Sequence, residues 1–182
     1  MKPIFFIDYD NTIFSHQTWQ IPESTLCALE QLQKDGYKLV IASGRAFRNN
    51  SLPEEFQGRI TPDCLFSENG AIVEIEGKLV KEKYFDKELQ RRILDYVVEK
   101  NYCLLSGQGN DWCTSSIERF KEIASPKQQQ LLPKSGEAYK ALYEKQIPSM
   151  FLADTKEAIA DVQEHFPETK LLCMGDELGG AD

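Results

Sequence analysis

An α/β fold built on a parallel sheet is predicted by three observations in the first 70 residues. Strand-like runs occupy residues 4–7, 38–42 and 63–67. A helical pattern separates the first two runs, and a polar segment separates the second from the third. Strands that alternate with crossover segments form parallel sheets with right-handed connections. Each run leads into a polar cluster, and ligands bind beyond the carboxyl ends of such strands.

The first run, Ile-Phe-Phe-Ile at residues 4–7, is continuously apolar and ends at Asp8. Because it does not alternate with polar residues, it predicts a buried strand of a parallel sheet. A helix is then expected from Pro22, closed by Gly36 as a C-cap. Three leucines recur along this helix at helical spacing: Leu26, Leu29 and Leu32.

The second strand, residues 38–42, runs directly into Ser43-Gly44-Arg45. A polar and helical stretch is expected from there to about Gly58. The third strand, residues 63–67, ends at Glu68-Asn69-Gly70. One parallel sheet would therefore bring the polar clusters at 8–12, 43–45 and 68–70 to a single edge.

The pattern changes after Gly70. Apolar and polar residues alternate along 71–84 on both sides of Glu76-Gly77, and this pattern predicts a β-hairpin. An amphipathic helix is expected over 86–100. Further strands are expected within 102–106, 111–115, 147–153 and 169–174, and helices near 134–146 and 155–166. We therefore predict two domains: a Rossmann-like core over 1–84 and an α+β cap domain over 85–182.

Composition limits the class of partner. The chain has 182 residues, a formal charge of −8 and a sequence pI near 4.9. An acidic protein lacks the basic surface that nucleic acids and anionic membranes require, so neither is expected as a partner. The five dispersed cysteines predict reduced thiols and a cytoplasmic location. A small phosphorylated metabolite remains compatible with this charge.

Asp8 and Asp10 are the first candidates for chemistry. On an extended strand end, residues two apart point the same way, and paired carboxylates suit Mg²⁺, which takes oxygen ligands. One carboxylate can attack phosphorus, and the other can donate a proton to a leaving alcohol. An Asp-x-Asp pair alone is also typical of a surface turn. The preceding strand and the following Asn11-Thr12 favour a catalytic site over a surface turn.

Three segments resemble motifs of the haloacid dehalogenase superfamily. FFIDYDNTIF is similar to its first motif, in which hydrophobic residues precede DxDGT, and IASGR resembles its second motif. SENGA resembles a sequence of the Cof-type branch of phosphatases, in which a C2-type cap domain follows. The resemblance is specific over residues 1–85. It implies a magnesium-dependent phosphoric monoester hydrolase.

The resemblance assigns roles by position. Asp8 matches the nucleophile and a metal ligand, and Asp10 matches the general acid and base, whose backbone carbonyl would also bind the metal. Ser43 matches the hydroxyl that binds the phosphoryl group, with the N–H of Gly44 beside it. Arg45 would hold a polar part of the substrate.

Two asparagines complete the expected set. Asn69 would line the same edge. Asn11 stands where the family has glycine. If that position requires a positive φ, asparagine is the least costly alternative. Its amide would add a polar group near the phosphate.

The two histidines, His16 and His165, are expected to face solvent.

Two further parts of the family's site are not recognisable: a lysine and a late acidic motif. Lys134, Lys140 and Lys170 qualify by residue type alone, and Gly175-Asp176 and Asp182 match the acidic motif only superficially. The chain alone is therefore expected to be catalytically feeble. It should also expose one sheet edge, with apolar strands such as 38–42, that invites self-association.

The expected function is hydrolysis of a small phosphate monoester, such as a sugar phosphate, through an aspartyl phosphate. Two alternatives stay open. A sugar phosphomutase would use the same nucleophile and return the phosphoryl group to a sugar. A non-catalytic module would bind a phosphometabolite without releasing phosphate. Substrate selection is expected in residues 86–182.

Overall fold

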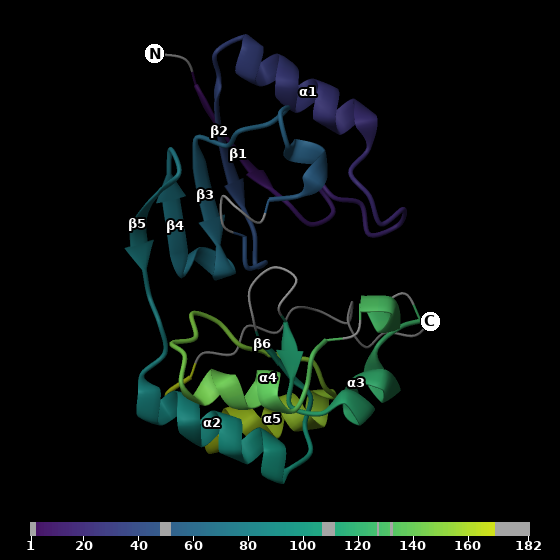
Figure 1. The fold of residues 1–182 in the computed structure, drawn as a ribbon, viewed down its shortest axis with the longest axis vertical. Helices are drawn as coiled ribbons and strands as arrows, with labels where there is room; N and C mark the ends of the chain where they lie inside the picture. The colour runs from purple at the N-terminus through teal and green to yellow at the C-terminus, as the bar shows by residue number, and fades with distance from the viewer. Residues whose placement is uncertain (1–2, 48–51, 107–111, 127, 132, 170–182) are drawn as a thin grey trace. The chain divides into compact units, whose positions relative to one another are not determined.

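A computed structural model of the protein describes residues 3–47, 52–106, 112–126, 128–131 and 133–169. The chain divides into two compact units, Met1–Lys83 and Tyr84–Asp182 (Figure 1). Each unit has its own sheet and its own buried core. The mixed α/β content and the mainly parallel strands of the first sheet confirm the predicted fold class.

The first unit is built on a five-stranded sheet in the order β1-β2-β3-β4-β5. The strands β1, β2 and β3 are parallel, and β4 and β5 add antiparallel to β3 and β4. Their bounds are Ile4–Asp8 for β1, Lys38–Ala42 for β2, Cys64–Ser67 for β3, Ile72–Ile75 for β4 and Lys78–Glu82 for β5.

The expectation that residues 4–7 form a buried strand is wrong. Among the described residues β1 is paired on one side only, so it forms an edge of the sheet. Phe6 is 70% exposed and Ile4 is 51% exposed. The expectation that 38–42 supplies an exposed edge is also wrong, because β2 lies between β1 and β3 and buries Leu39, Val40 and Ile41.

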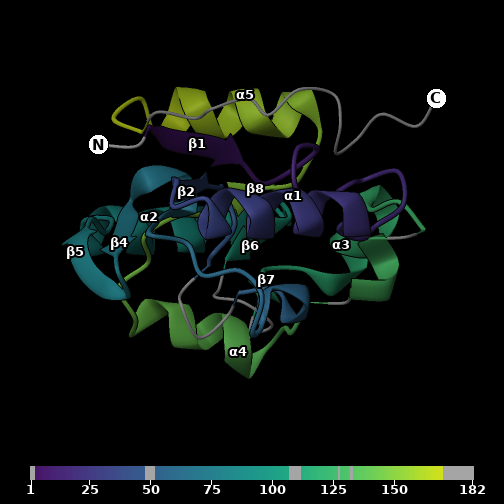
Figure 2. The ribbon, with the colours of Figure 1, turned by 90° about the horizontal axis from the view of Figure 1, so that it is seen from above.

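Helix α1, Glu23–Lys34, packs on one face of this sheet, and Figure 2 shows it along one side of the strands. Leu26 and Leu29 of α1 share a buried cluster with Leu39, Ile41 and Leu65. The helix ends as predicted, because Gly36 adopts a φ of 78° just beyond its last turn.

The predicted hairpin is present, with β4 and β5 joined by Glu76 and Gly77 at φ of 47° and 75°. Two successive residues with positive φ are typical of a type I′ turn. The helix expected after Arg45 is not found in the described part of that segment. Residues 52–58 contain one 3₁₀ turn, η2, at Glu54–Phe56, which begins directly after Pro53.

The second unit combines a three-stranded antiparallel sheet, in the order β7-β6-β8, with four α-helices among the described residues. The strands are β6 Leu104–Ser106, β7 Cys113–Thr114 and β8 Phe151–Leu152. The helices are α2 Lys87–Glu99, α3 Ile117–Ile123, α4 Glu137–Lys140 and α5 Lys156–His165. Short 3₁₀ turns are η3 Glu68–Gly70 in the first unit, and η4 Gln128–Leu131 and η5 Ala141–Tyr143 in the second.

Helix α2 begins at the predicted place, where the Asp86 side chain accepts hydrogen bonds from the N–H groups of Glu88 and Leu89. Helix α3 was not predicted. It is short and begins at Ser116, whose hydroxyl accepts from the N–H of Arg119. The strand expected over 169–174 falls almost entirely outside the described residues.

Buried polar groups organise the second unit. Gln90 is 2% exposed, and its amide contacts Leu142, Lys145 and Ile147 at backbone atoms 2.7 to 3.2 Å away. The Asp154 carboxylate is fully buried and forms an ion pair with Arg119 at 2.7 Å. Such groups are tolerated inside a protein because each has its hydrogen-bond partners.

No helix within the described residues is long and apolar enough to cross a membrane. The four cysteines that the structure describes, Cys27, Cys64, Cys103 and Cys113, are free thiols, in agreement with the expectation from sequence. Cys173 lies outside the described residues.

Candidate functional site

The three polar clusters lie at one edge of the first sheet, where the parallel strands end. The strand register aligns Asp8 with Ala42 and Ala42 with Phe66. The backbone N–H of Ser43 donates to Phe66 at 2.9 Å, and that of Asn69 donates to Ser43 at 3.2 Å. The segments that follow β1, β2 and β3 therefore meet, as the order of the strands predicted.

The turn after β3 is fixed against the turn after β2. Glu68, Asn69 and Gly70 have consecutive positive φ values of 52°, 54° and 80°. This conformation is costly for residues other than glycine and is concentrated at functional sites. It places the Asn69 side chain so close to Gly44 that a Cβ there would lie 3.0 Å from Asn69 Oδ1. A larger residue at position 44 would therefore crowd the Asn69 side chain.

The loop after β1 is a tight turn around Tyr9. The carbonyl of Tyr9 accepts hydrogen bonds from the N–H groups of Ile13 at 2.9 Å and Phe14 at 2.8 Å. Asn11 has a φ of 60°, so the position does require the left-handed conformation that glycine would supply. Asn11 Oδ1 also accepts from the N–H of His16 at 3.3 Å. Asn11 thus adopts the backbone conformation that glycine would supply, and its side chain links the start of the loop to His16.

Arg45 and Asp10 form the main charged contact of the site. Arg45 Nη2 donates to Asp10 Oδ1 at 2.7 Å, and its Nε lies 3.1 and 3.2 Å from the two carboxylate oxygens. The guanidinium carbon lies 4.9 Å from the ring centroid of Tyr9 and 4.6 Å from that of Phe14. The forked contact and the aromatic rings together fix the orientation of Arg45. The Ser43 hydroxyl accepts from the Arg45 N–H at 3.0 Å.

His16 is a member of the site that the sequence did not reveal. Its side chain is 41% exposed, so the expectation that it faces solvent holds, but Nε2 also lies 2.8 Å from Asp10 Oδ1. The imidazole stacks on Trp19, with ring centroids 6.0 Å apart. Asp10 thus has contacts to two side chains that carry N–H donors. Spacing along the chain gave no signal for this contact, which depends on the loop's tight turns.

Tyr9 forms the floor beneath Arg45. It is 2% exposed, and burial raises the pKa of its phenol to about 12, against a smaller lowering by Arg45. The ring is therefore neutral at physiological pH. At the end of β3, the Ser67 hydroxyl is buried and has no hydrogen-bond partner among the described residues.

Asp8 is the last residue of β1, and its side chain is exposed. No hydrogen bond engages its carboxylate within the part of the chain that the structure describes. The backbone carbonyl of Asp10 likewise accepts no backbone hydrogen bond there. These two oxygen donors fit a hard cation such as Mg²⁺ that keeps most of its water ligands. The described residues contain no group of three or more His, Cys, Asp or Glu side chains that would complete a metal site.

The candidates for the lysine and the acidic motif all belong to the second unit of the chain, and none belongs to the first. Lys140 belongs to the second unit and pairs with Glu137 at 2.7 Å on the surface. Lys134 also belongs to the second unit. Lys170, Gly175, Asp176 and Asp182 lie outside the described residues.

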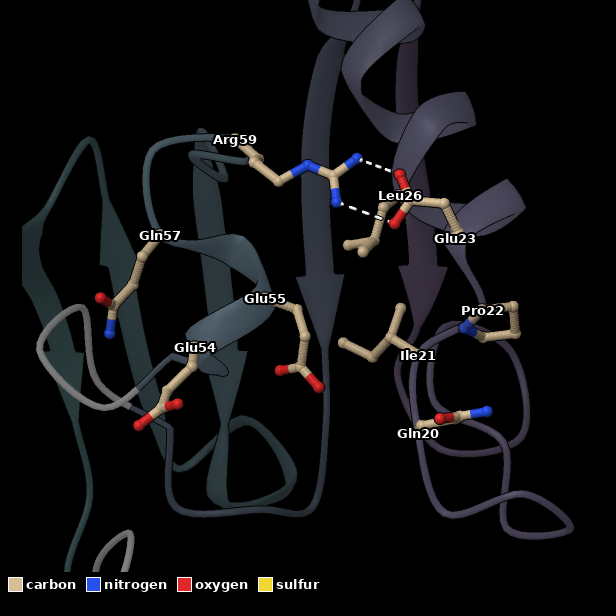
Figure 3. Close-up of a pocket in the computed structure, with 9 residues that line it drawn as sticks. All are labelled: Gln20, Ile21, Pro22, Glu23, Leu26, Glu54, Glu55, Gln57 and Arg59. Carbon is tan, nitrogen blue, oxygen red and sulfur yellow. Dashed lines mark hydrogen bonds and ion pairs between the residues drawn. The ribbon is translucent and has the colours of Figure 1, made fainter.

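A separate open cavity of about 480 Å³ lies beside the start of α1 and η2. Figure 3 shows its lining, in which both carboxylate oxygens of Glu23 accept hydrogen bonds from Arg59. None of the candidate site residues lines it. Arg59 also contacts Glu30, so this cluster ties α1 to the segment that precedes β3. We interpret it as a structural contact of α1.

Comparison with known proteins identifies the family. The chain matches the family described as haloacid dehalogenase-like hydrolase over residues 5–174. It is 33% identical over 92 residues to a Bacillus subtilis protein named "Putative phosphatase YkrA", a match that covers 50% of this chain and 34% of that protein.

Solved structures agree in fold. The subclass IIB sugar phosphatase BT4131 has a TM-score of 0.69 and 23% identity, over 92% of this chain and 64% of that chain. The phosphatase-superfamily protein BT1666 from Bacteroides thetaiotaomicron has a TM-score of 0.71 and 20% identity, over 91% and 60%. A HAD/COF-like hydrolase from Plasmodium vivax has a TM-score of 0.69 and 17% identity, over 91% and 62%.

This chain therefore spans less than two thirds of the length of these solved proteins. The family match nevertheless covers nearly all of the chain and includes the strand ends that carry Asp8, Ser43 and Asn69. The chain belongs to the haloacid dehalogenase-like hydrolases.

Proposed function

We propose that this protein hydrolyses a small phosphate monoester, such as a sugar phosphate, with Asp8 as the nucleophile. The observation that carries the proposal is the meeting of three strand ends at one edge, with Asp8 exposed and free of partners among the described residues. We also propose that the protein acts in the cytoplasm, where free thiols such as those observed persist.

The first step is attack by an Asp8 oxygen on phosphorus. The bond between phosphorus and the substrate's alcohol oxygen breaks, and Asp10, in its protonated form, gives its proton to that oxygen. In the second step a water attacks the aspartyl phosphate, Asp10 takes its proton, and phosphate leaves. Mg²⁺, held by Asp8 and the Asp10 carbonyl, would supply charge neutralisation at the phosphoryl oxygens.

The other residues bind and orient. The Ser43 hydroxyl and the Gly44 N–H would hold the phosphoryl oxygens, and Asn69 and Asn11 would border the same position. Arg45 is paired with Asp10 in the structure. A substrate phosphate would compete for its guanidinium and thereby release Asp10 for proton transfer. The second unit would act as a cap domain and select the substrate.

The test is Mg²⁺-dependent release of phosphate from an aryl phosphate by the chain and its Asp8→Asn variant. Asn keeps the shape of the side chain but not its charge or nucleophilicity, so we expect a loss of at least a hundredfold. Asp35→Asn, an exposed aspartate beyond the end of α1, is the matched control and should retain full activity. If Asp8→Asn keeps a tenth of the activity, Asp8 is not the nucleophile.

A binding module without turnover is the second candidate, favoured by the absence of a third acidic side chain near Asp8 in the described residues. It predicts no phosphate release, together with thermal stabilisation by inorganic phosphate that is lost in Ser43→Ala. Phosphate release that depends on Asp8 excludes it.

A further inference from the structure

The loop that follows β1 holds a tryptophan in a strained backbone conformation. Trp19 has a φ of 56°, in the left-handed region that bulky residues rarely adopt. Its N–H donates to the carbonyl of Ser15 at 2.7 Å, and the N–H of Ser15 donates to the carbonyl of Gln20 at 3.0 Å. These two hydrogen bonds close a tight turn. Strain of this kind persists only where surrounding contacts maintain it, and it is concentrated at functional sites.

The contacts of the Trp19 side chain lead to His16. The two rings stack, with centroids 6.0 Å apart and an angle of 23° between their planes. The Phe14 ring makes T-shaped contacts with both, at 5.7 Å from His16 and 6.2 Å from Trp19. The backbone N–H of His16 donates to Asn11 Oδ1 at 3.3 Å. The imidazole is therefore held by two rings and by its own backbone, although its side chain is 41% exposed.

The contacts of Asp10 distinguish its two carboxylate oxygens. His16 Nε2 lies 2.8 Å from Oδ1. Arg45 contacts both oxygens, with Nη2 2.7 Å from Oδ1 and Nε 3.2 Å from Oδ2. When the guanidinium turns to a substrate phosphate, the His16 contact at Oδ1 remains and the Arg45 contact at Oδ2 is lost. One oxygen of Asp10 is then still held, and the other is open to the substrate.

We propose that His16 and Trp19 are positioning residues for the general acid, and that Oδ2 of Asp10 is the oxygen that transfers the proton. This inference rests on the proposed phosphatase function and adds to it. The proton moves from Oδ2 to the alcohol oxygen as the bond between that oxygen and phosphorus breaks. The Nε2–H of His16 donates to Oδ1 before and after this step, because the carbonyl oxygen of an acid and the oxygen of a carboxylate both accept hydrogen bonds.

The effect of this positioning should depend on the leaving group. Phenolate is a strong base that needs a proton as it leaves, whereas 4-nitrophenolate is a much weaker base and leaves without one. The orientation of the acid therefore matters more for phenyl phosphate than for 4-nitrophenyl phosphate, an ester of similar shape. The value of kcat/KM reports the steps up to departure of the alcohol. Later hydrolysis of the aspartyl phosphate, in which Asp10 acts as a base, does not affect it.

The first test measures kcat/KM for both esters in the 182-residue chain and in its variants at position 16. We expect His16→Ala to lower kcat/KM roughly tenfold for phenyl phosphate, a part of what general acid catalysis contributes, and less than about threefold for 4-nitrophenyl phosphate. His16→Gln should recover most of the loss, because its amide N–H can replace Nε2–H. Thr18→Ala removes an exposed side chain from the same turn and is the matched control, with both values unchanged.

The second test asks whether Trp19 acts through His16. Trp19→Ala should also lower kcat/KM for phenyl phosphate, and the double variant should lose no more than His16→Ala alone. Losses that multiply in the double variant overturn the proposal, as does a His16→Ala loss that is absent or equal for the two esters. Each of these results leaves the phosphatase function intact. A wild type that releases no phosphate from either ester overturns that function, and this inference with it.

Discussion

Removing the Asp154 carboxylate should destabilise the second unit more than any surface change. This side chain is fully buried and accepts hydrogen bonds from Arg119, from the backbone N–H of Cys103 at 2.8 Å and from that of Thr155 at 2.8 Å. It thereby joins α3 to the start of β6 and to the start of α5. Asp154→Ala leaves the Arg119 charge without its main partner and the Cys103 N–H without an acceptor.

Breaking a buried ion pair by removing one partner costs about 3–5 kcal/mol. The Arg119 side chain is 25% exposed and can turn toward water, so we expect a value near the lower limit, about 3 kcal/mol. For a unit of roughly 100 residues, each kcal/mol lowers the melting temperature by about 4–8 °C. The expected decrease is therefore roughly 12–24 °C.

Tryptophan fluorescence during urea unfolding can follow each unit separately, because Trp19 lies in the first unit and Trp112 in the second. In a Trp19→Phe background, Asp154→Ala should shift the Trp112 transition. Asp95→Ala is the control. It removes an exposed aspartate that pairs with Arg91 at 3.9 Å and accepts a hydrogen bond from the Tyr143 hydroxyl at 2.8 Å. Exposed contacts of this kind contribute at most about 1 kcal/mol each. Equal effects of the two changes would refute the importance of burial.

The pH dependence provides an independent check. Burial alone would disfavour the charged form of Asp154, but hydrogen bonds from Arg119 and from the N–H groups of Cys103 and Thr155 outweigh it and lower its pKa. A lowered pKa in the folded state means that this stabilisation is fully present above the unfolded-state value near 3.8. It is lost as pH falls further, through the folded-state pKa. The difference between the wild type and Asp154→Ala should therefore shrink below about pH 4 and stay constant from pH 5 to 8.

Two further outcomes are expected in the first unit. Asp10→Asn should slow turnover by roughly 10²–10⁴-fold while the dependence on Mg²⁺ concentration stays the same, because its metal contact would be through the backbone; a kcat titrated against Mg²⁺ measures both. Unchanged turnover with weakened Mg²⁺ binding would reverse the assigned roles. Ser67→Ala should raise the free energy of unfolding by up to about 1 kcal/mol, measured in urea, because it removes a buried hydroxyl that has no partner among the described residues. A decrease would show that the hydroxyl has a partner.

Turns and helix ends were predicted correctly from the sequence, because they depend on residues that are close together in the chain. The Glu76-Gly77 turn, the Asp86 cap and the Gly36 stop each depend on residues within one turn of the chain. The strand ends met because parallel strands share one edge. The burial of residues 4–7 was predicted wrongly. An apolar run shows that a strand is suited to a buried position, whereas its actual burial depends on whether a neighbouring strand is present on each side. Helix α3 was missed because seven residues give too few turns to establish a period.

The contacts of Asp10 show where sequence reasoning about the site ends. Motif resemblance identified Asp10 and Arg45 separately, but neither motif indicates that the two side chains pair. That contact exists because the turn around Tyr9 folds Asp10 back toward the end of β2, and Tyr9 and Phe14 hold the guanidinium in place. His16 contacts the same carboxylate, and its backbone N–H donates to the side chain of Asn11, which has a positive φ. A glycine at position 11 would supply the φ but not the amide oxygen that holds the N–H of His16. The departure from the family's glycine and the presence of His16 beside Asp10 are therefore two parts of one local arrangement.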